Sequence, residues 1–310
     1  MNDAPAIIVL GPTATGKSAL ALDLASRLGG EIISLDSMQV YQGMDIGTAK
    51  PSAADRSRVP HHLVDCQAVT EPSDAAQVCS RAHDAEQAVR SRGSLPIFAG
   101  GTALYIKLFV DGLFAGPAAD QAVRAELAAL AAAHGSAWLH QHLLAPVDPA
   151  SAARLHPNDL RRIVRALEVY RATGVPISAR QTQWGASDTA CPYRLIGLIV
   201  PRDELYRRIE ARVDAMLAAG LVAEVKRLRD AGIERNAVAA QAIGYKELLA
   251  HLAGRVSLDE AVRLIKRNTR RFAKHQLTWF RRDQRIHWFD VTAHGPAEDL
   301  AKAVLAWISS

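Results

Sequence analysis

Short apolar runs alternate with longer segments of helix-forming residues along much of the chain. The early runs cover 7–10, 32–35 and 95–99, and two later ones cover 195–200 and 286–291. Apolar runs of this length, bounded by turn-forming residues and separated by helices, are typical of buried parallel strands. The pattern therefore predicts an α/β fold, a parallel sheet with helices on both faces.

Residues 114–193 interrupt this alternation, because the stretch contains helical patterns and no run that resembles a strand. Nine of the sixteen residues in 118–133 are alanine, and the apolar positions of 158–171 recur at helical spacing. Glycine and proline mark both borders of the stretch. We therefore expect two domains: a catalytic core formed by 1–113 and 194–310, and a helical insert domain of 114–193.

The composition narrows the class of protein. Hydrophobic residues make up 49% and charged residues 22% of the chain, which are ordinary values for a globular protein and argue against disorder or a collagen-like chain. No apolar run approaches the roughly 18 residues of a membrane helix, and the first residues lack a secretory signal. Cys66, Cys79 and Cys191 fit neither a disulfide framework nor a metal site. We expect a cytoplasmic protein with reduced thiols.

The positive charge is concentrated near the end of the chain. The net charge is +5, but residues 263–285 hold nine lysines and arginines against one acid, which leaves −3 elsewhere. On a helix, one face of this segment carries Arg263, Arg267, Arg270, Arg271 and Lys274, and the opposite face carries Ile265, Thr269 and Phe272. Acids spaced to pair with this face are missing, which favours a nucleic-acid partner over a merely solvated face.

One motif, G-x-x-x-x-G-K-[ST], lies between the first apolar run and the first helical segment. It consists of Gly11, Pro12, Thr13, Ala14, Thr15, Gly16, Lys17 and Ser18. Such a loop turns backbone N–H groups toward phosphate, its lysine reaches the phosphate oxygens, and its hydroxyl can bind Mg²⁺. The motif predicts a diphosphate or triphosphate ligand on a P-loop NTPase-like sheet. It does not identify that ligand as ATP.

Two groups of residues at predicted strand ends are expected to face this loop. Asp36 follows the second apolar run, and three roles remain open for it: a carboxylate beside Mg²⁺, a general base, or the cap of the next turn. Gly100, Gly101 and Thr102 follow the third run and either line the same crevice or form a tight turn.

Arginines and aromatics elsewhere leave similar alternatives. Arg208 and Arg212 lie one helical turn apart, and each either binds a phosphate or pairs with a nearby glutamate. Trp279 and Phe280 stack on an unpaired base or belong to the core. Arginines of the insert, at 161, 162 and 165, form a second basic patch for nucleic acid or for nucleotide phosphates.

Taken in order, the motifs resemble those of the tRNA dimethylallyltransferase (tRNA isopentenyltransferase) family. The resemblance is carried by the P-loop and by residues 34–41 (SLDSMQVY), 44–51 (MDIGTAKP), 100–105 (GGTALY), 158–168, 241–246 (QAIGYK) and 274–281. No pair of Cys or His residues suited to the zinc finger of eukaryotic members follows residue 290. We therefore expect a bacterial-type, zinc-free enzyme.

The resemblance implies a reaction and its catalytic residues. A dimethylallyl group would pass from dimethylallyl diphosphate to N6 of adenine 37 in tRNA. The P-loop would hold the diphosphate rather than ATP, and Ser18 would bind Mg²⁺ as cofactor. Asp36 would be the general base, while Lys17 and Arg212 would bind and stabilise the diphosphate. The main alternative is a P-loop kinase of a small molecule or nucleotide, and a third is a non-catalytic RNA-binding protein.

The same resemblance implies how tRNA is bound. The insert would grip the anticodon stem-loop, and the protein would act as a monomer. The residues expected to contact tRNA are Asp36, Ser37, Met38, Gln39, Thr102, Arg124, Arg161, Arg162, Ile163, Val164, Arg165, Gln241, Ala242, Ile243, Gly244, Tyr245, Lys246, Lys274, His275, Gln276, Leu277, Thr278, Trp279, Phe280 and Arg281.

Overall fold

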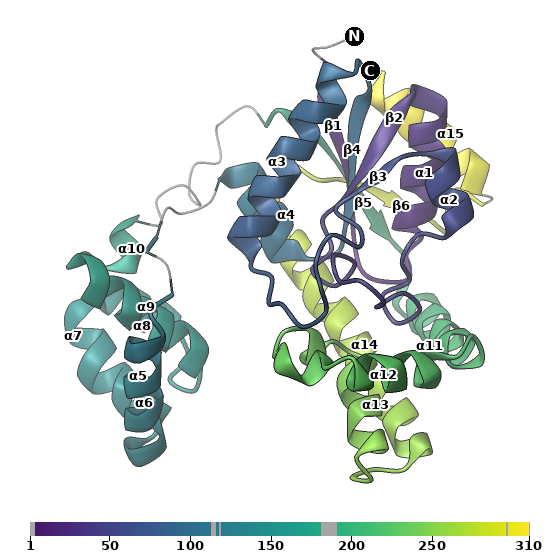
Figure 1. Cartoon of the computed structure of the whole chain (residues 1–310). Coiled ribbons are helices and arrows are strands. Elements are labelled where there is room, and N and C mark those ends of the chain that lie inside the picture. Colours follow the sequence, from purple (N-terminus) through teal and green to yellow (C-terminus); the bar gives the residue numbers. More distant parts are fainter. Residues whose placement is uncertain (1–3, 113–115, 118, 181–190, 296, 310) are drawn as a thin grey trace. The chain divides into compact units, whose positions relative to one another are not determined.

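The chain separates into two compact units. A computed structural model describes residues 4–112, 116–117, 119–180, 191–295 and 297–309 (Figure 1). The larger unit consists of Met1–Val110 and Cys191–Ser310, and the smaller one of Asp111–Ala190. Among the described helices, none is both long and apolar enough to cross a membrane.

A six-stranded sheet forms the centre of the larger unit. Its spatial order is β3 (His61–His62), β2 (Gly30–Ser34), β4 (Leu95–Gly100), β1 (Ala6–Leu10), β5 (Tyr193–Ile199) and β6 (His287–Asp290). All neighbouring strands are parallel, which confirms the predicted α/β class. Every residue of β1 and β2 is buried, as the continuous apolar runs indicate. The two-residue strand β3 has no apolar run and was not predicted.

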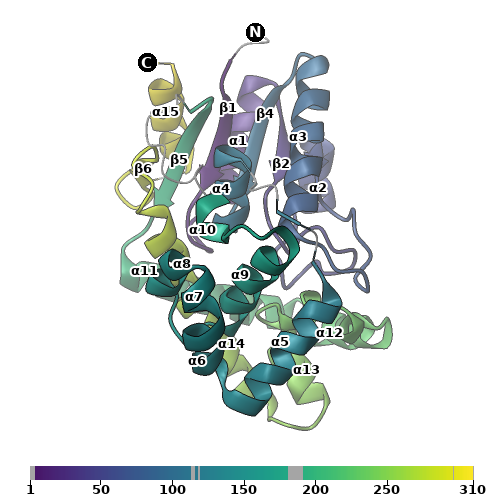
Figure 2. The same cartoon turned by 90° about the vertical axis from the view of Figure 1, so that its left-hand side faces the viewer.

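Helices cover both faces of this sheet (Figures 1 and 2). On one face, α1 (Lys17–Leu28) and α15 (Ala297–Ile308) share a core with Ile97 of β4. On the other face are α3 (Ala75–Ser91) and α4 (Ala103–Asp111), where the rings of Phe98 and Phe109 lie 4.5 Å apart. Ile97 and Phe98 lie on opposite faces because the side chains of successive strand residues point to opposite sides of the sheet.

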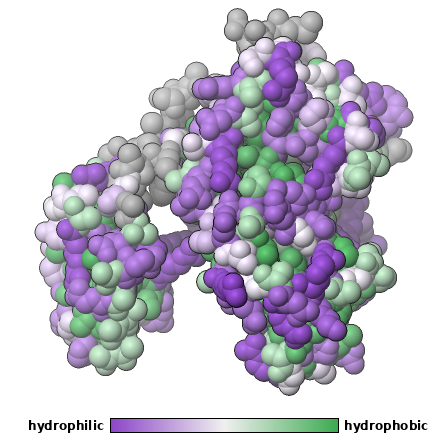
Figure 3. All heavy atoms as spheres, in the orientation of Figure 1, coloured by the Kyte–Doolittle hydropathy of each residue, from purple (hydrophilic) through white to green (hydrophobic). Residues whose placement is uncertain are grey.

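A second core lies below the carboxyl ends of the strands (Figure 1). It joins Tyr41 and Met44 to a group of helices. These are α11 (Arg202–Ala218), α12 (Leu221–Asp230), α13 (Tyr245–Leu252) and α14 (Leu258–Phe280), with the short helices η2 (Ile233–Arg235) and η3 (Ala239–Gln241) between them. The loop that follows β2 contributes Tyr41 and Met44 and is thereby held against these helices, whereas the short helix α2 (Ala53–Arg58) lies beside α1 (Figure 1). On the visible face of this unit, hydrophobic residues form small groups among hydrophilic ones (Figure 3).

The smaller unit is helical in the residues that the structure describes. Its elements are α5 (Gln121–His134), α6 (Ser136–Leu139), η1 (His140–Leu144), α7 (Ala145–Val147), α8 (Pro149–Arg154), α9 (Leu160–Thr173) and α10 (Ile177–Arg180). The alanine-rich segment forms α5, and the second helix predicted for this region is α9. Leu127 and Ile163 are fully buried in a core of this unit's own.

Candidate active site

The path of the P-loop is fixed by hydrogen bonds within the loop and by its close approach to β5. A Cβ atom on Gly11, which directly follows β1, would lie 2.6 Å from the Leu198 carbonyl oxygen of β5. Only glycine allows the chain to approach β5 this closely. The Thr15 hydroxyl donates to the Pro12 carbonyl at 2.8 Å, and Lys17 Nζ donates to the same oxygen at 2.7 Å. Because α1 begins at Lys17, the first N–H groups of the helix also point to this loop.

Two cations face one carboxylate beside the loop. Burial lowers the pKa of Lys17 to about 7, with a further contribution from Arg212, while Asp36 acts in the opposite direction. Burial also lowers the pKa of Arg212, against the attraction of Asp36. Arg212 donates no hydrogen bond to any other described residue. This part of the site is therefore suited to a multivalent anion, because an anion relieves the repulsion between the two cations.

Arg208 and Arg212 were each expected either to bind a phosphate or to pair with a nearby glutamate, and the structure distinguishes them. Arg208 Nε lies 2.7 Å from a Glu204 carboxylate oxygen, so this arginine forms the local ion pair. Arg212 forms no ion pair within the described part of the chain, and its side chain lines the cavity described below. Of the two arginines, only Arg212 is placed to meet a phosphate.

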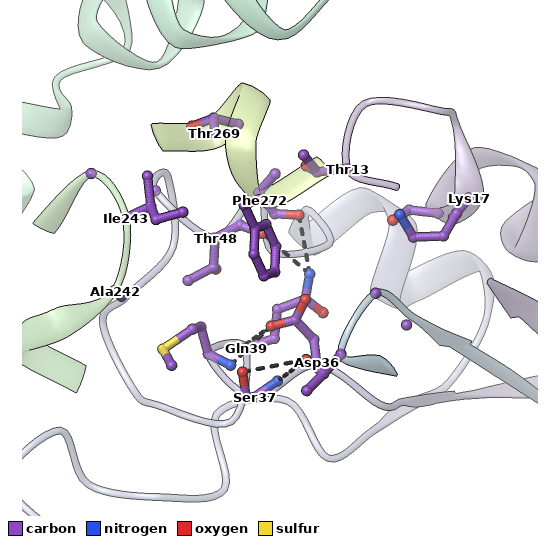
Figure 4. Close-up of a pocket in the computed structure, with 18 of the residues that line it drawn as sticks. Thr13, Lys17, Asp36, Ser37, Gln39, Thr48, Ala242, Ile243, Thr269 and Phe272 are labelled. Carbon is purple, nitrogen blue, oxygen red and sulfur yellow. Dashed lines mark hydrogen bonds between the residues drawn. The ribbon is translucent and has the colours of Figure 1, made fainter. Parts of the chain in front are cut away.

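Asp36 caps a turn and also faces the cavity (Figure 4). Its Oδ1 accepts from the backbone N–H groups of Met38 at 2.9 Å and Gln39 at 3.4 Å. Oδ2 accepts no hydrogen bond from the described residues. The capping role considered for Asp36 is therefore confirmed, and it leaves the second oxygen available for chemistry.

Helix α14 connects the P-loop to the end of β4. Gln276, which is 5% exposed, accepts the Thr13 N–H through Oε1 at 2.9 Å and donates from Nε2 to the Gly101 carbonyl at 2.7 Å. Nearby, the Thr102 hydroxyl accepts the Ser37 N–H at 3.2 Å. Both ends of the Gln276 amide thus bind backbone groups of the protein.

These elements enclose a cavity of about 430 Å³. Polar groups of the P-loop, Asp36 and Gln39 line part of it, and apolar side chains line another part: Ile209, Val213, Met216, Ile265 and Phe272. Phe272 is 42% exposed, and its ring points from α14 toward Asp36 and Gln39 (Figure 4). The cavity therefore suits a ligand that combines a phosphate group with an apolar group.

The apolar wall was not predicted from the sequence. The helical period placed Ile265, Thr269 and Phe272 opposite the basic face of α14, which is compatible with an ordinary core face. In the structure this face lines the cavity. A large apolar residue that stays exposed, as Phe272 does, is the feature that distinguishes a ligand surface from a core, and exposure is not readable from periodicity.

The prediction that the basic face of α14 lacks acidic partners is wrong for two of its five residues, Arg263 and Arg270, and the neighbouring Lys266 is paired as well. Arg263 makes a two-point contact with Glu260, at 2.6 and 2.7 Å. Lys266 and Arg270 pair with two acids of α11, Asp214 and Glu210. Tertiary packing supplies those two acids from 52 and 60 residues away in sequence. Within the described residues, the basic side chains of α14 and the following turn that remain without an ion pair include Arg271, Lys274, Arg281 and Arg282.

The basic residues expected in the insert are partly held by a buried carboxylate. Glu168, only 1% exposed, accepts from Arg124 at 2.8 Å and from Arg165 at 2.5 Å. Arg162 lies 3.4 Å from Asp159, whereas Arg161 has no ion pair among the described residues. The predicted tRNA positions 163 and 280 are buried, so their side chains belong to cores.

Comparison with known proteins places the chain in a family. A family model described as IPP transferase matches residues 39–283. The chain belongs to the IPP transferase family. The tRNA dimethylallyltransferase of Geobacter metallireducens is 54% identical over 286 residues, covering 92% of each chain. That of Desulforudis audaxviator is 47% identical over 304 residues, covering 98% of this chain and 97% of the relative.

Solved structures agree with this membership. The tRNA isopentenylpyrophosphate transferase of Bacillus halodurans superposes with a TM-score of 0.70 at 39% identity, over 99% of this chain and 97% of the other. A eukaryotic dimethylallyltransferase acting on tRNA superposes with a TM-score of 0.75 at 27% identity, over 93% of this chain and 74% of the other. The resemblance inferred from the motifs is confirmed.

The charge of Lys17 predicts a pH dependence of anion binding by this IPP transferase. A bound anion favours the protonated lysine, so affinity for inorganic diphosphate should fall as pH rises through about 7. Calorimetric titration between pH 6 and 9 measures this fall. Lys17→Arg is the matched control, since a guanidinium stays charged over the whole range. Profiles of the same shape for the two proteins would assign the pH dependence to the ligand and contradict the prediction.

Proposed function

We propose that this chain transfers the dimethylallyl group of dimethylallyl diphosphate to N6 of adenine 37 in tRNA, releasing diphosphate. The observation that carries the proposal is the single cavity in which a P-loop, Asp36 and an apolar wall meet. The apolar wall beside the phosphate site suits the hydrocarbon part of a prenyl diphosphate. The relatives named tRNA dimethylallyltransferase support the same choice over a kinase.

The donor fits the cavity in one orientation. Its diphosphate is held by the P-loop backbone, Lys17 and Arg212, where a multivalent anion relieves the repulsion between the two cations. Its dimethylallyl group packs on the apolar side chains of α11 and α14, including Met216 and Phe272. This arrangement directs the reacting carbon C1 toward the part of the cavity that contains Asp36.

The residues present fit a magnesium ion bound largely through the substrate. No cluster of three or more His, Cys, Asp or Glu able to hold a metal occurs among the described residues. The Ser18 hydroxyl, however, lines the cavity at the start of α1, and Mg²⁺ is commonly held by one or two protein oxygens together with substrate phosphates and water. Ser18 would hold the ion, which supplies additional positive charge to the diphosphate.

N6 of adenine is a weak nucleophile, because its lone pair is delocalised into the ring. Catalysis therefore acts mainly by stabilising the diphosphate as it leaves. The bond between C1 and the diphosphate oxygen breaks, and its electron pair leaves with the diphosphate. Lys17, Arg212 and the N–H groups of the loop stabilise this growing negative charge. As the N6–C1 bond forms, one N6 proton passes to Oδ2 of Asp36, the oxygen that does not cap the turn.

The acceptor base must leave its stack to reach this cavity, at a cost of a few kcal/mol. Contacts with the rest of the tRNA offset that cost. We propose that residues 36–39 and 102, with the less buried members of 241–246, meet the extruded base and its neighbours; those members are Gln241, Ile243 and Lys246. The exposed members of 274–281 meet the phosphate backbone; they are Lys274, His275, Thr278 and Arg281. The insert, through Arg124, Arg161, Arg162 and Arg165, grips the anticodon stem-loop. The protein acts as a monomer in the cytoplasm.

Asp36→Asn separates the two roles of this side chain. Asparagine keeps the oxygen that caps the turn but cannot accept a proton, so the single-turnover transfer rate should fall by about 10²- to 10⁴-fold. The dissociation constant for tRNA should stay within about threefold of wild type, because the turn is retained. Asp36→Ala, which also removes the cap, should weaken tRNA binding as well. An asparagine variant as fast as wild type would leave Asp36 with the capping role alone.

The unpaired basic residues of α14 predict the salt dependence of tRNA binding. Replacing Arg271 and Lys274 by glutamine should reduce the slope of log Kd against log salt by roughly 1.5, since each contact with a phosphate contributes about 0.7 to 0.9. Arg27→Gln with Lys302→Gln is the control, because it removes equal charge from α1 and α15. Equal slopes for the two double variants would mean that this face of α14 is only solvated.

A further inference from the structure

A buried carboxylate on α12 binds a loop that precedes it by about 180 residues. Glu224 is 2% exposed. Its Oε2 accepts the N–H groups of Asp45 at 3.1 Å and Ile46 at 2.8 Å. Its Oε1 accepts the Gly47 N–H at 3.2 Å and the Tyr245 hydroxyl at 2.7 Å. Four hydrogen bonds therefore converge on one carboxylate.

Burying a charged carboxylate destabilises the folded state unless its oxygens accept hydrogen bonds. Glu224 lies in the first turn of α12, where the helix dipole favours a negative charge, and its four donors compensate its removal from water. Three of these donors are consecutive backbone N–H groups. The arrangement fixes the path of residues 45–47 more tightly than apolar packing alone would.

The same loop, residues 44–50, is held at its other edge. Gln39 Nε2 donates to the carbonyls of Thr48 and Ala49 at 3.3 and 3.4 Å, and the Gln39 Oε1 accepts from the Ser34 hydroxyl at 2.9 Å. Lys50, with a side chain only 1% exposed, donates to the Tyr41 carbonyl at 2.8 Å. Ala49 has φ 48°, a conformation that is unfavourable for alanine and persists only where its surroundings fix it.

Gly47 lies directly against the ring of Tyr245. A Cβ atom on Gly47 would be 2.5 Å from the Tyr245 ring, so only glycine allows this approach. Glu224 binds both partners, the Gly47 N–H and the Tyr245 hydroxyl. One carboxylate thus ties the loop 44–50 to the segment 241–245.

We infer that Glu224 is a positioning residue for the acceptor base. It holds the loop so that Gly47, Thr48 and Ala49 form a fixed wall of the cavity beside Gln39. In Figure 4, Thr48 lies on the side of Ala242 and Ile243, and Lys17 lies on the other side. The inference rests on the proposed function, which assigns that side to tRNA.

The hydrogen bonds of this loop determine which substrate is affected. Within the described residues they lead to positions 34–41, 65, 224 and to the loop itself, and none leads to the P-loop. A change at Glu224 should therefore reach the acceptor side of the cavity and leave the donor side intact.

Glu224→Gln is the variant that tests this role. A glutamine has the same shape, but its amide has one oxygen where Glu224 has two. If that oxygen keeps the bonds to Asp45 and Ile46, the NH₂ group faces the Gly47 N–H and cannot accept from it. Two donors then oppose each other where the loop lies against Tyr245. We expect the KM for an unmodified anticodon stem-loop to rise about tenfold. The KM for dimethylallyl diphosphate should stay within about twofold of wild type, because the P-loop is not part of the network.

A matched control is available in Glu86→Gln. Glu86 also accepts a tyrosine hydroxyl, that of Tyr193 at 3.2 Å, but does not line the cavity. The Glu86→Gln variant should change the thermal stability of the protein without changing the KM for the stem-loop or the KM for dimethylallyl diphosphate. Tyr245→Phe removes one of the four bonds to Glu224, and should raise the KM for the stem-loop by about threefold. This variant decides the question if Glu224→Gln does not fold.

The outcomes separate the inference from the proposed function. A wild-type protein that transfers no dimethylallyl group would overturn the proposed function. Wild-type transfer, with an unchanged stem-loop KM in Glu224→Gln or with both KM values raised equally, would overturn only the positioning role. A raised stem-loop KM with a normal donor KM supports it.

Discussion

The site depends on two cations that are held close together in a partly buried place. Lys17 belongs to the P-loop and Arg212 to α11, and both lie close enough to Asp36 to interact with its charge. Burial opposes both charges, and one carboxylate does not balance two cations. A diphosphate resolves this conflict, and it does so most strongly when it carries the extra charge of a leaving group. The same feature therefore serves binding and catalysis.

Helix α14 organises the site around that charge. Gln276 joins the P-loop to the end of β4, Phe272 turns an apolar surface toward the cavity, and the outer face carries the basic residues. One helix can do all three because its faces repeat every 3.6 residues. Acids of α11 pair with part of the basic face and keep α11 and α14 together. The remaining cations are available to a polyanion.

Local patterns were enough to predict the features that depend on short segments. Five of the six strands, the P-loop and the position of Asp36 at a strand end follow from runs of a few residues. Contacts between distant segments could not be predicted this way. The pairing of Arg270 with Glu210, the apolar wall around Phe272 and the bonds of Glu224 to residues 45–47 all require the tertiary arrangement. Periodicity assigns a residue to a face, but it does not say what that face contacts.

The central claim is that the cavity holds a prenyl diphosphate opposite an RNA base. Single-turnover reaction of the protein with labelled dimethylallyl diphosphate, Mg²⁺ and unmodified tRNA, followed by nucleoside analysis, tests it most directly. The account predicts label on N6 of adenine 37 and release of diphosphate. An RNA without label, together with transfer of phosphate from ATP to a small acceptor in a parallel reaction, would contradict the account and identify a kinase.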